Sequence, residues 1–320
     1  MTWTLLAVNV LVWAATELDG GSADPEVLVR FGAMFGPLIA NGEYWRLFTA
    51  MFLHVGGTHL VVNSIGLLIL GMLVERLFGH YRFTAIYVLA GLAGSVASYA
   101  FNSVGVAAGA SGAILGIFGA LVAFFVVRRS TMGEMGRQTL TGLMVLLGIN
   151  LFYGFASPGI DNFAHLGGFV AGFGLGTAFA PRYRPVLNAF GAVAVMRDSN
   201  SLLKRWWVIP LSASVLVLGA TLASAAVSDN PIARSISHLR EAQRLLEDGD
   251  HSSALDEVDQ AIAFDPYSGA QYLVRAKVWA SLGDRQRAIS DAGTAIRVGL
   301  DDDGLGEALE LVRKLRSGVH

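Results

Sequence analysis

Apolar stretches of membrane-spanning length occupy most of the first 228 residues of this 320-residue chain. A helix needs about 20 mostly apolar residues to cross the hydrocarbon core of a bilayer. Seven stretches approach this length, at about residues 2–16, 58–76, 83–102, 110–127, 138–156, 160–180 and 206–227. Because lipid cannot hydrogen-bond the backbone, such segments are expected to be helices. The sequence therefore predicts an all-α, polytopic bundle of membrane helices.

Residues 229–320 differ in composition from the rest. The whole chain has only 15% charged residues, against about 25% in soluble proteins, yet Asp, Glu, Lys and Arg are dense after residue 229. We expect a small soluble α-helical domain to follow the membrane bundle. The net charge of −2 indicates no nucleic-acid partner. The absence of cysteine excludes disulfides and thiolate catalysis.

Basic residues gather on one side of the predicted helices, whereas the loop at 17–45 is mainly acidic. The basic residues are Arg76, Arg82, Arg128, Arg129, Arg137, Arg182, Arg184, Arg197, Lys204 and Arg205. The positive-inside rule then places the N-terminus in the cytoplasm and residues 229–320 outside it. We expect a bacterial plasma membrane. Residues 3–16 lack a basic region before them, so no cleaved signal peptide is expected.

In this orientation, four polar side chains from three predicted helices lie at similar depth near the outer face. His59 and Asn63 lie in the first turns of one helix, and Ser111 and His165 near the starts of two others. Polar residues inside a membrane usually face the interior of the bundle. We therefore expect these four side chains to converge.

Their chemistry is that of acyl transfer. Ser111 and His165 are the minimum parts of a serine nucleophile and its general base. Free backbone N–H groups at the helix start can receive an oxyanion. His59 and Asn63, spaced i and i+4, share one helix face and can donate to the same oxyanion. His165 would accept the Ser111 proton and return it to the leaving amine.

Glycines recur every three or four residues on two of these helices. Such stripes let membrane helices approach closely, and here they would bring Ser111 to His165. Gly109 and Gly112 also leave room around the serine. The stripes comprise Gly112, Gly116 and Gly119 on one helix and Gly168, Gly172 and Gly176 on the other.

The chain resembles the rhomboid family of intramembrane serine proteases over about residues 1–182. The matching motifs are Trp45-Arg46, His59-Leu60-Val61-Val62-Asn63, Gly109-Ala110-Ser111-Gly112, and Ala164-His165 followed by Gly168 and Gly172. The resemblance implies a six-helix core that cleaves transmembrane protein substrates within the lipid bilayer, with no cofactor and no metal.

The resemblance also implies roles for single residues. Ser111 would be the nucleophile and His165 the base of a dyad. Asn63, His59 and the Ser111 N–H would form the oxyanion hole. The supporting residues would be Gly109, Gly112, Gly168, Trp45 and Arg46.

Leu115 and Asp161 lie close to these motifs. Leu115 stands where many relatives carry an aromatic ring that stacks on the histidine, so the imidazole would be held less firmly, which bears on the rate more than on the type of reaction. Asp161, four residues before His165, is either the third member of a triad or a helix cap, and the family's dyad favours the cap.

A 34-residue repeat lies within residues 235–298. Ala242, Gly249-Asp250, Ala254 and Ala261-Ile262 recur as Ala276, Gly283-Asp284, Ala288 and Ala295-Ile296. The period resembles that of the tetratricopeptide repeat, which implies a protein or peptide ligand for residues 235–316. A generic amphipathic helical hairpin is the alternative.

These observations divide the chain into four parts. They are a protease core at 1–182, a cytoplasmic linker at 183–205, a seventh transmembrane helix at 206–228 and an extracytoplasmic helical domain at 229–320. The main alternative function is a non-catalytic scaffold that binds membrane clients, although inactive relatives typically lose the serine or the histidine. A transporter would need charged residues in mid-span, and the spans have none.

Overall fold

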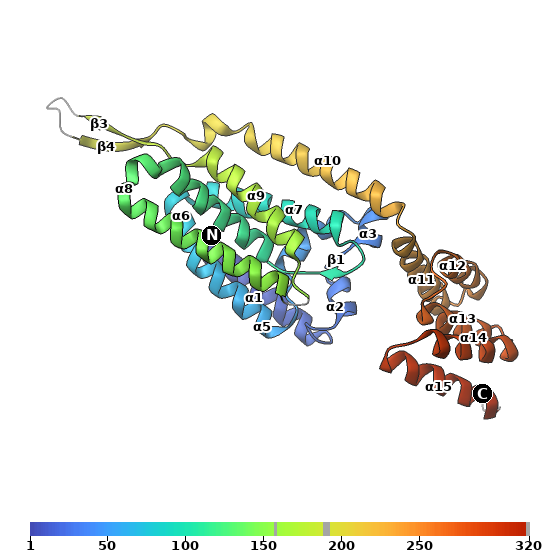
Figure 1. Cartoon of the computed structure of the whole chain (residues 1–320). Coiled ribbons are helices and arrows are strands. Elements are labelled where there is room, and N and C mark those ends of the chain that lie inside the picture. The colour runs from blue at the N-terminus through green and yellow to red at the C-terminus, as the bar shows by residue number, and fades with distance from the viewer. Residues whose placement is uncertain (157–158, 188–192, 318–320) are drawn as a thin grey trace. The chain divides into compact units, whose positions relative to one another are not determined.

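The computed structural model describes residues 1–156, 159–187 and 193–317. Contacts within the chain divide it into two units, Met1–Ala225 and Ala226–His320 (Figure 1). This division lies three residues before the predicted end of the seventh helix at residue 228. The four predicted parts therefore stay a prediction.

Apolar helices make up most of the first unit. In chain order they are α1 (Thr2–Leu18), α5 (Gly56–Gly66), α6 (Met72–Phe78), α7 (His80–Phe101), α8 (Ser111–Ala156), α9 (Asn162–Phe179) and α10 (Val208–Ser228). A π-helical turn, η2 (Leu67–Gly71), joins α5 to α6. Within the described residues, five segments are long and apolar enough to cross a membrane: Gly56–Phe78, His80–Phe101, Ser111–Arg129, Gly136–Ala156 and Val208–Ser228.

These five segments coincide with five of the seven predicted spans. Gly133, with φ 57° and ψ −143°, breaks α8 between the fourth and fifth predicted spans. The first and sixth predicted spans are present as the shorter helices α1, of 17 residues, and α9, of 18 residues. The chain is thus a multi-pass membrane protein, and the total of seven spans stays a prediction.

Helices α7, α8 and α9 lie side by side and form the centre of the first unit (Figure 1). The fully buried side chains there include Phe83, Tyr87, Ile117 and Phe179. Since lipid tails are as apolar as these side chains, close packing rather than the hydrophobic effect holds membrane helices together.

The first loop contains short elements that pack beside the helices. They are α2 (Pro25–Arg30), β1 (Met34–Phe35), α3 (Gly36–Ala40), α4 (Arg46–Thr49) and η1 (Ala50–Phe52). β1 pairs antiparallel with β2 (Val106–Ala107), with Met34 opposite Ala107. This ladder ties the loop to the segment that leads into Ser111. The prediction of an all-α chain did not include it.

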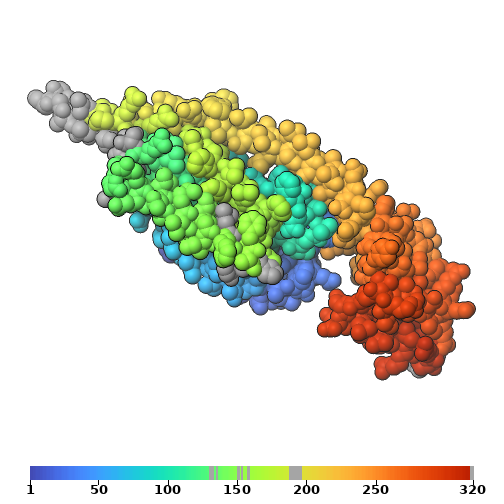
Figure 2. All heavy atoms as spheres, in the orientation of Figure 1, coloured from blue at the N-terminus to red at the C-terminus, as the bar shows by residue number. Residues whose placement is uncertain are grey.

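α10 is attached to both the loop and the bundle. Ser224 Oγ lies 2.9 Å from the hydroxyl of Tyr44 and 2.8 Å from that of Tyr99 on α7. A Cβ at Gly219 would lie 3.1 Å from Val96 of α7. Figure 2 shows α10 as a yellow strip along the edge of this unit.

The segment predicted as a linker at 183–205 contains regular structure, with residues 188–192 outside the described residues. β3 (Tyr183–Leu187) and β4 (Val193–Asp198) pair antiparallel, and η3 (Leu202–Arg205) follows. The described residues are mostly helical, as predicted, and this strand pair is an addition that the all-α prediction did not include.

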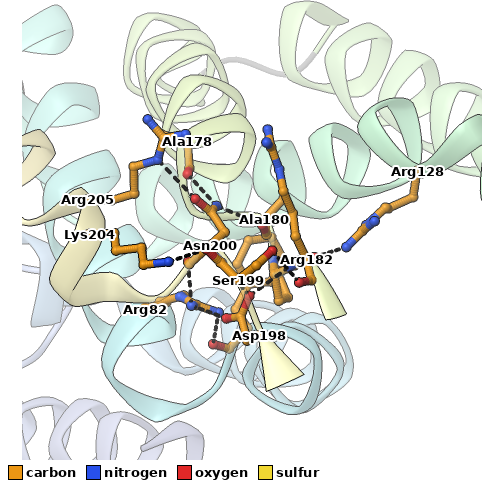
Figure 3. A network of polar contacts seen from close by, with 12 residues as sticks. Arg82, Arg128, Ala178, Ala180, Arg182, Asp198, Ser199, Asn200, Lys204 and Arg205 are labelled. Carbon is orange, nitrogen blue, oxygen red and sulfur yellow. Dashed lines mark hydrogen bonds and ion pairs between the residues drawn. The ribbon is translucent and has the colours of Figure 1, made fainter. Parts of the chain in front are cut away.

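A polar network anchors this hairpin to the ends of the bundle (Figure 3). The Arg82 guanidinium of α7 forms an ion pair with Asp198 and donates to the Asn200 carbonyl at 2.8 Å. The Asn200 amide donates to the carbonyls of Ala178 at 3.0 Å and Ala180 at 2.9 Å. These two carbonyls belong to the C-terminal end of α9, where intrahelical partners are lacking.

In its described residues, the second unit consists of two helix pairs followed by a fifth helix. They are α11 (Pro231–Glu247), α12 (His251–Phe264), α13 (Gly269–Ser281), α14 (Arg285–Val298) and α15 (Asp302–Ser317). The alanines of the 34-residue repeat are fully buried between them. Gly249 and Gly283 adopt φ of 82° and 84° before the capping residues Asp250 and Asp284. The turns at Gly249-Asp250 and Gly283-Asp284 therefore have the same backbone conformation and the same type of helix cap.

Candidate active site

Ser111 is the first residue of α8, and the backbone before it requires glycine. Gly109 has φ +148°, a conformation that side chains rarely adopt. A Cβ at Gly109 would also lie 2.8 Å from Cε1 of His59. The Gly109 N–H donates to the Ala50 carbonyl at 2.9 Å. The chain therefore enters α8 with the serine held close to the His59 ring.

His165 lies in the first turn of α9 and meets Ser111 directly. Its Nε2 and the Ser111 Oγ form a hydrogen bond of 2.9 Å. Both side chains are half-buried. The hydroxyl and the imidazole are thus in the geometry in which a proton can pass between them.

The glycine stripes explain how two helices bring these side chains together. A Cβ on Gly168 would lie 2.0 Å from the Gly112 carbonyl oxygen, and one on Gly172 would lie 1.9 Å from the Gly116 carbonyl oxygen. Real Cβ contacts are never this short, so the backbones of α8 and α9 touch. Close backbone contact of this kind is typical of small residues at membrane helix interfaces.

His59 lies on α5 with its ring beside Gly109. Its Nδ1 accepts a hydrogen bond of 3.3 Å from the Val55 N–H. In a neutral imidazole the other nitrogen then carries the proton. Nε2 would lie 3.1 Å from a Cβ placed at Gly109, so this N–H donor faces the approach to Ser111.

Asn63 lies one turn further along α5 and is buried. Its Nδ2 donates to the His59 carbonyl at 2.9 Å. In the part of the chain that the structure describes, this bond goes to the helix and not to Ser111. One amide hydrogen of Asn63 remains for another acceptor.

Trp45 and Arg46 organise the first loop and do not contact Ser111 or His165. Arg46 is buried, and its Nη1 donates to the carbonyls of Val29 at 2.5 Å and Ala33 at 3.2 Å. Its guanidinium lies 4.6 Å from the Trp45 ring centroid. Arg46, the first residue of α4, thus ties the segment 29–33 at the end of α2 to the start of α4.

Asp161 caps α9 and does not bond the His165 ring. One oxygen accepts from the Ala164 N–H at 2.9 Å, and the other accepts from the hydroxyl of Ser98 on α7. A cavity next to Ser111 is lined by Ser95, Ser98, Asp161 and Ala164, among others. Asp161 is therefore the N-cap of α9 and is not bonded to His165 as the third member of a triad would be.

His54 and Ser98 lie near the site and are not among the site residues predicted from the sequence. The His54 ring is fully buried and lies edge-on to His59, with 5.4 Å between ring centroids. Burial lowers the pKa of His54 to about 4, and the neighbouring His59 adds to the effect. The only feature of the sequence that could have drawn attention to His54 is its position five residues before His59. Ser98 carried no signal beyond its polarity in an apolar stretch.

Leu115 is buried one turn after Ser111. It belongs to a cluster with Phe118, Val122 and Leu147, against which Phe169 of α9 also packs. Aliphatic and aromatic side chains from both helices thus fill this level of the interface.

Comparison with known proteins identifies the family of this chain. The rhomboid domain family model matches residues 41–182. The "Putative rhomboid protease YdcA" of Bacillus subtilis (strain 168) is 36% identical over 173 residues, which are 53% of this chain and 83% of that protein. This chain belongs to the rhomboid family.

Longer relatives are similar over the same region. The "Rhomboid protease GluP" of Bacillus subtilis (strain 168) is 42% identical over 191 residues, covering 59% of this chain and 36% of that protein. The "RHOMBOID-like protein 1" of Arabidopsis thaliana is 38% identical over 156 residues, covering 48% of this chain and 40% of that protein. The chain thus spans well under half the length of these two rhomboid relatives.

Proposed function

We propose that this rhomboid is an intramembrane serine endopeptidase that hydrolyses peptide bonds in or near transmembrane segments of membrane proteins. The observation that carries the proposal is the 2.9 Å hydrogen bond between Ser111 Oγ and His165 Nε2. The names of two relatives, both called rhomboid proteases, support it. A non-catalytic scaffold is not favoured, because inactive relatives typically lose the serine or the histidine and this chain keeps both.

In the proposed reaction, Ser111 Oγ attacks the substrate carbonyl carbon while His165 Nε2 takes the hydroxyl proton. The carbonyl oxygen becomes an oxyanion in the tetrahedral intermediate. The imidazolium then gives its proton to the leaving amine, and an acyl ester on Ser111 remains. Water, deprotonated by His165, attacks this ester, and the proton returns to Ser111 Oγ when the ester bond breaks.

The oxyanion would be held by donors from two helices. The Ser111 N–H at the start of α8 is one, since the first N–H groups of a helix lack partners within it. The His59 Nε2–H beside Gly109 is the second, and the free amide hydrogen of Asn63 is the third. Removing one such donor costs about 100- to 1000-fold in kcat in serine proteases.

The orientation proposed from the sequence places this site near the outer face. The N-terminus would lie in the cytoplasm and residues 229–320 outside a bacterial plasma membrane. The basic residues at the ends of α7 and α9 and in the β3–β4 segment support this arrangement.

We infer that the second unit is a tetratricopeptide-like domain that recruits or orients membrane substrates. Its support is the pairing of α11 with α12 and α13 with α14, together with identical Gly-Asp turns 34 residues apart. If deletion of residues 235–320 left the cleavage of every native substrate unchanged, this role would be wrong.

The main test is a cleavage assay on the reconstituted protein. The substrate is a single-span protein with small, helix-weakening residues near its outer end. Wild type is compared with Ser111→Ala and His165→Ala. Cleavage by wild type and its loss in both variants is the expected result, whereas cleavage by Ser111→Ala would contradict the proposal.

A further inference from the structure

We propose that Asp161 is a positioning residue, which ties the first turn of α9 to α7 and so holds the His165 imidazole against Ser111. The inference rests on the proposed roles of Ser111 and His165. It assigns Asp161 no contact with substrate.

The two carboxylate oxygens of Asp161 act on different helices. Oδ1 accepts from the Ala164 N–H at 2.9 Å, within α9. Oδ2 accepts from the hydroxyl of Ser98, which is fully buried on α7. The Asp161 carbonyl accepts from the His165 N–H at 3.1 Å. Three bonds at Asp161 therefore involve α7, Ala164 and the backbone of His165 itself.

The turn that Asp161 holds has little space to move. The Ala164 carbonyl oxygen would lie 2.7 Å from a Cβ on Gly94 of α7 and 3.2 Å from one on Gly112 of α8. The Asn162 amide donates to the Gly154 carbonyl at 3.0 Å. Because His165 directly follows Ala164, a shift of this turn would move the imidazole away from the serine.

The charge of Asp161 is not what this role requires. Both oxygens are occupied by the Ala164 N–H and the Ser98 hydroxyl, and neither bonds the imidazole. An asparagine at this position can accept from the Ala164 N–H with its oxygen and donate to Ser98 Oγ with its amide. A catalytic triad, by contrast, would require a carboxylate on His165 Nδ1.

The kinetic test compares Asp161→Ala, Asp161→Asn and Asp24→Ala with wild type in the reconstituted cleavage assay. A displacement of about 1 Å can cost about 100-fold in rate. We expect Asp161→Ala to lower kcat by about 10- to 100-fold, with KM within about twofold. Asp161→Asn should recover most of kcat. The matched control Asp24→Ala removes the side-chain cap of α2 and should leave kcat unchanged.

A second measurement does not depend on activity. Hydrogen exchange followed by mass spectrometry reports opening of the backbone at residues 162–168. We expect faster exchange there in Asp161→Ala and protection close to wild type in Asp161→Asn, with exchange in α11–α15 equal in all three proteins.

The outcomes separate the two proposals. Unchanged exchange in Asp161→Ala would overturn the positioning role, and so would an Asp161→Asn variant as impaired as Asp161→Ala. Faster exchange in Asp161→Ala, together with cleavage that survives Ser111→Ala, would leave the positioning role intact and contradict the proposed protease mechanism.

Discussion

At the scale of single residues, the contact between α8 and α9 depends on glycines, which have no side chain to keep the two backbones apart. Gly168 has no room for even one carbon, since a Cβ would lie 2.0 Å from the Gly112 carbonyl oxygen. A backbone oxygen cannot turn aside as a flexible side chain can. The helices themselves must therefore separate if this glycine is replaced.

We predict that Gly168→Ala destabilises the protein by about 1–3 kcal/mol, the usual cost of overpacking, and lowers cleavage by at least about tenfold. The control is Gly174→Ala on the same helix, where a Cβ would meet nothing within 4 Å. Thermal unfolding and kcat are measured for both variants. Equal effects of the two substitutions would contradict the account of this interface.

His54 predicts a dependence of stability on pH. The folded protein keeps its imidazole neutral because burial lowers the pKa to about 4, from an ordinary value of 6.5. Between these values the unfolded chain binds more protons than the folded one, so stability falls as the pH is lowered from about 6.5 to about 4.

His54→Gln removes this titration while it keeps a polar side chain of similar size. We expect wild type to lose more thermal stability than His54→Gln between pH 7 and pH 5. The measurement is the unfolding midpoint of both proteins at the two values. The same loss in both proteins would show that His54 is not the group responsible.

The candidate site residues could be selected from sequence because their types are rare in apolar segments. The motifs around Ser111 and His165 predicted that these two residues form a pair. The glycine stripes predicted that their helices approach closely enough for contact. Ser98 could not be found in this way. Its partner Asp161 is 63 positions away, and a serine in an apolar helix is compatible with many backbone contacts.

At the scale of elements, hydropathy predicted the apolar helices well and the connections poorly. Spanning helices are visible from length and composition alone. The ladder between β1 and β2 is only two residues long on each strand, too short for an alternating pattern. The β3–β4 pair combines Pro185 with Arg184 and Arg197, and no local pattern identified these segments as paired strands.

The hairpin's attachment to α7 is testable. Although burial acts to raise the pKa of Asp198, hydrogen bonds from Arg82 and from the backbone N–H groups of Arg182 and Asn200 outweigh it and hold that pKa below its ordinary value. Because the folded pKa is lowered, the ion pair stabilises the protein above about pH 4 and is lost as the pH falls further.

We predict that Asp198→Asn costs about 3 kcal/mol of stability, since it leaves the buried Arg82 without its counter-charge. Glu134→Gln is the control, because the Glu134–Arg137 pair is exposed and such pairs contribute little. Both are compared with wild type in chemical unfolding at pH 7. A loss no greater than that of the control would contradict this role for Asp198.

At the scale of the whole molecule, the change in composition near residue 229 predicted two parts, and the contacts divide the chain at nearly the same place. An amphipathic pattern can be recognised within a single stretch of sequence, so the helices of the second unit could be expected from sequence. Which helices of the first unit touch depends on the glycines and on polar bonds between distant residues. Tyr44, Tyr99 and Ser224 come from three separate segments, and their association could not be read from any one of them.

Covalent labelling of Ser111 is the sharpest test of the proposed Ser111–His165 dyad. The purified protein is treated with a fluorophosphonate, and the modified residue is located by mass spectrometry, with His165→Ala alongside. We expect a label on Ser111 in wild type and strongly reduced labelling in His165→Ala, because the imidazole would take the hydroxyl proton. A label on another serine, or equal labelling of Ser111 without His165, would contradict the dyad.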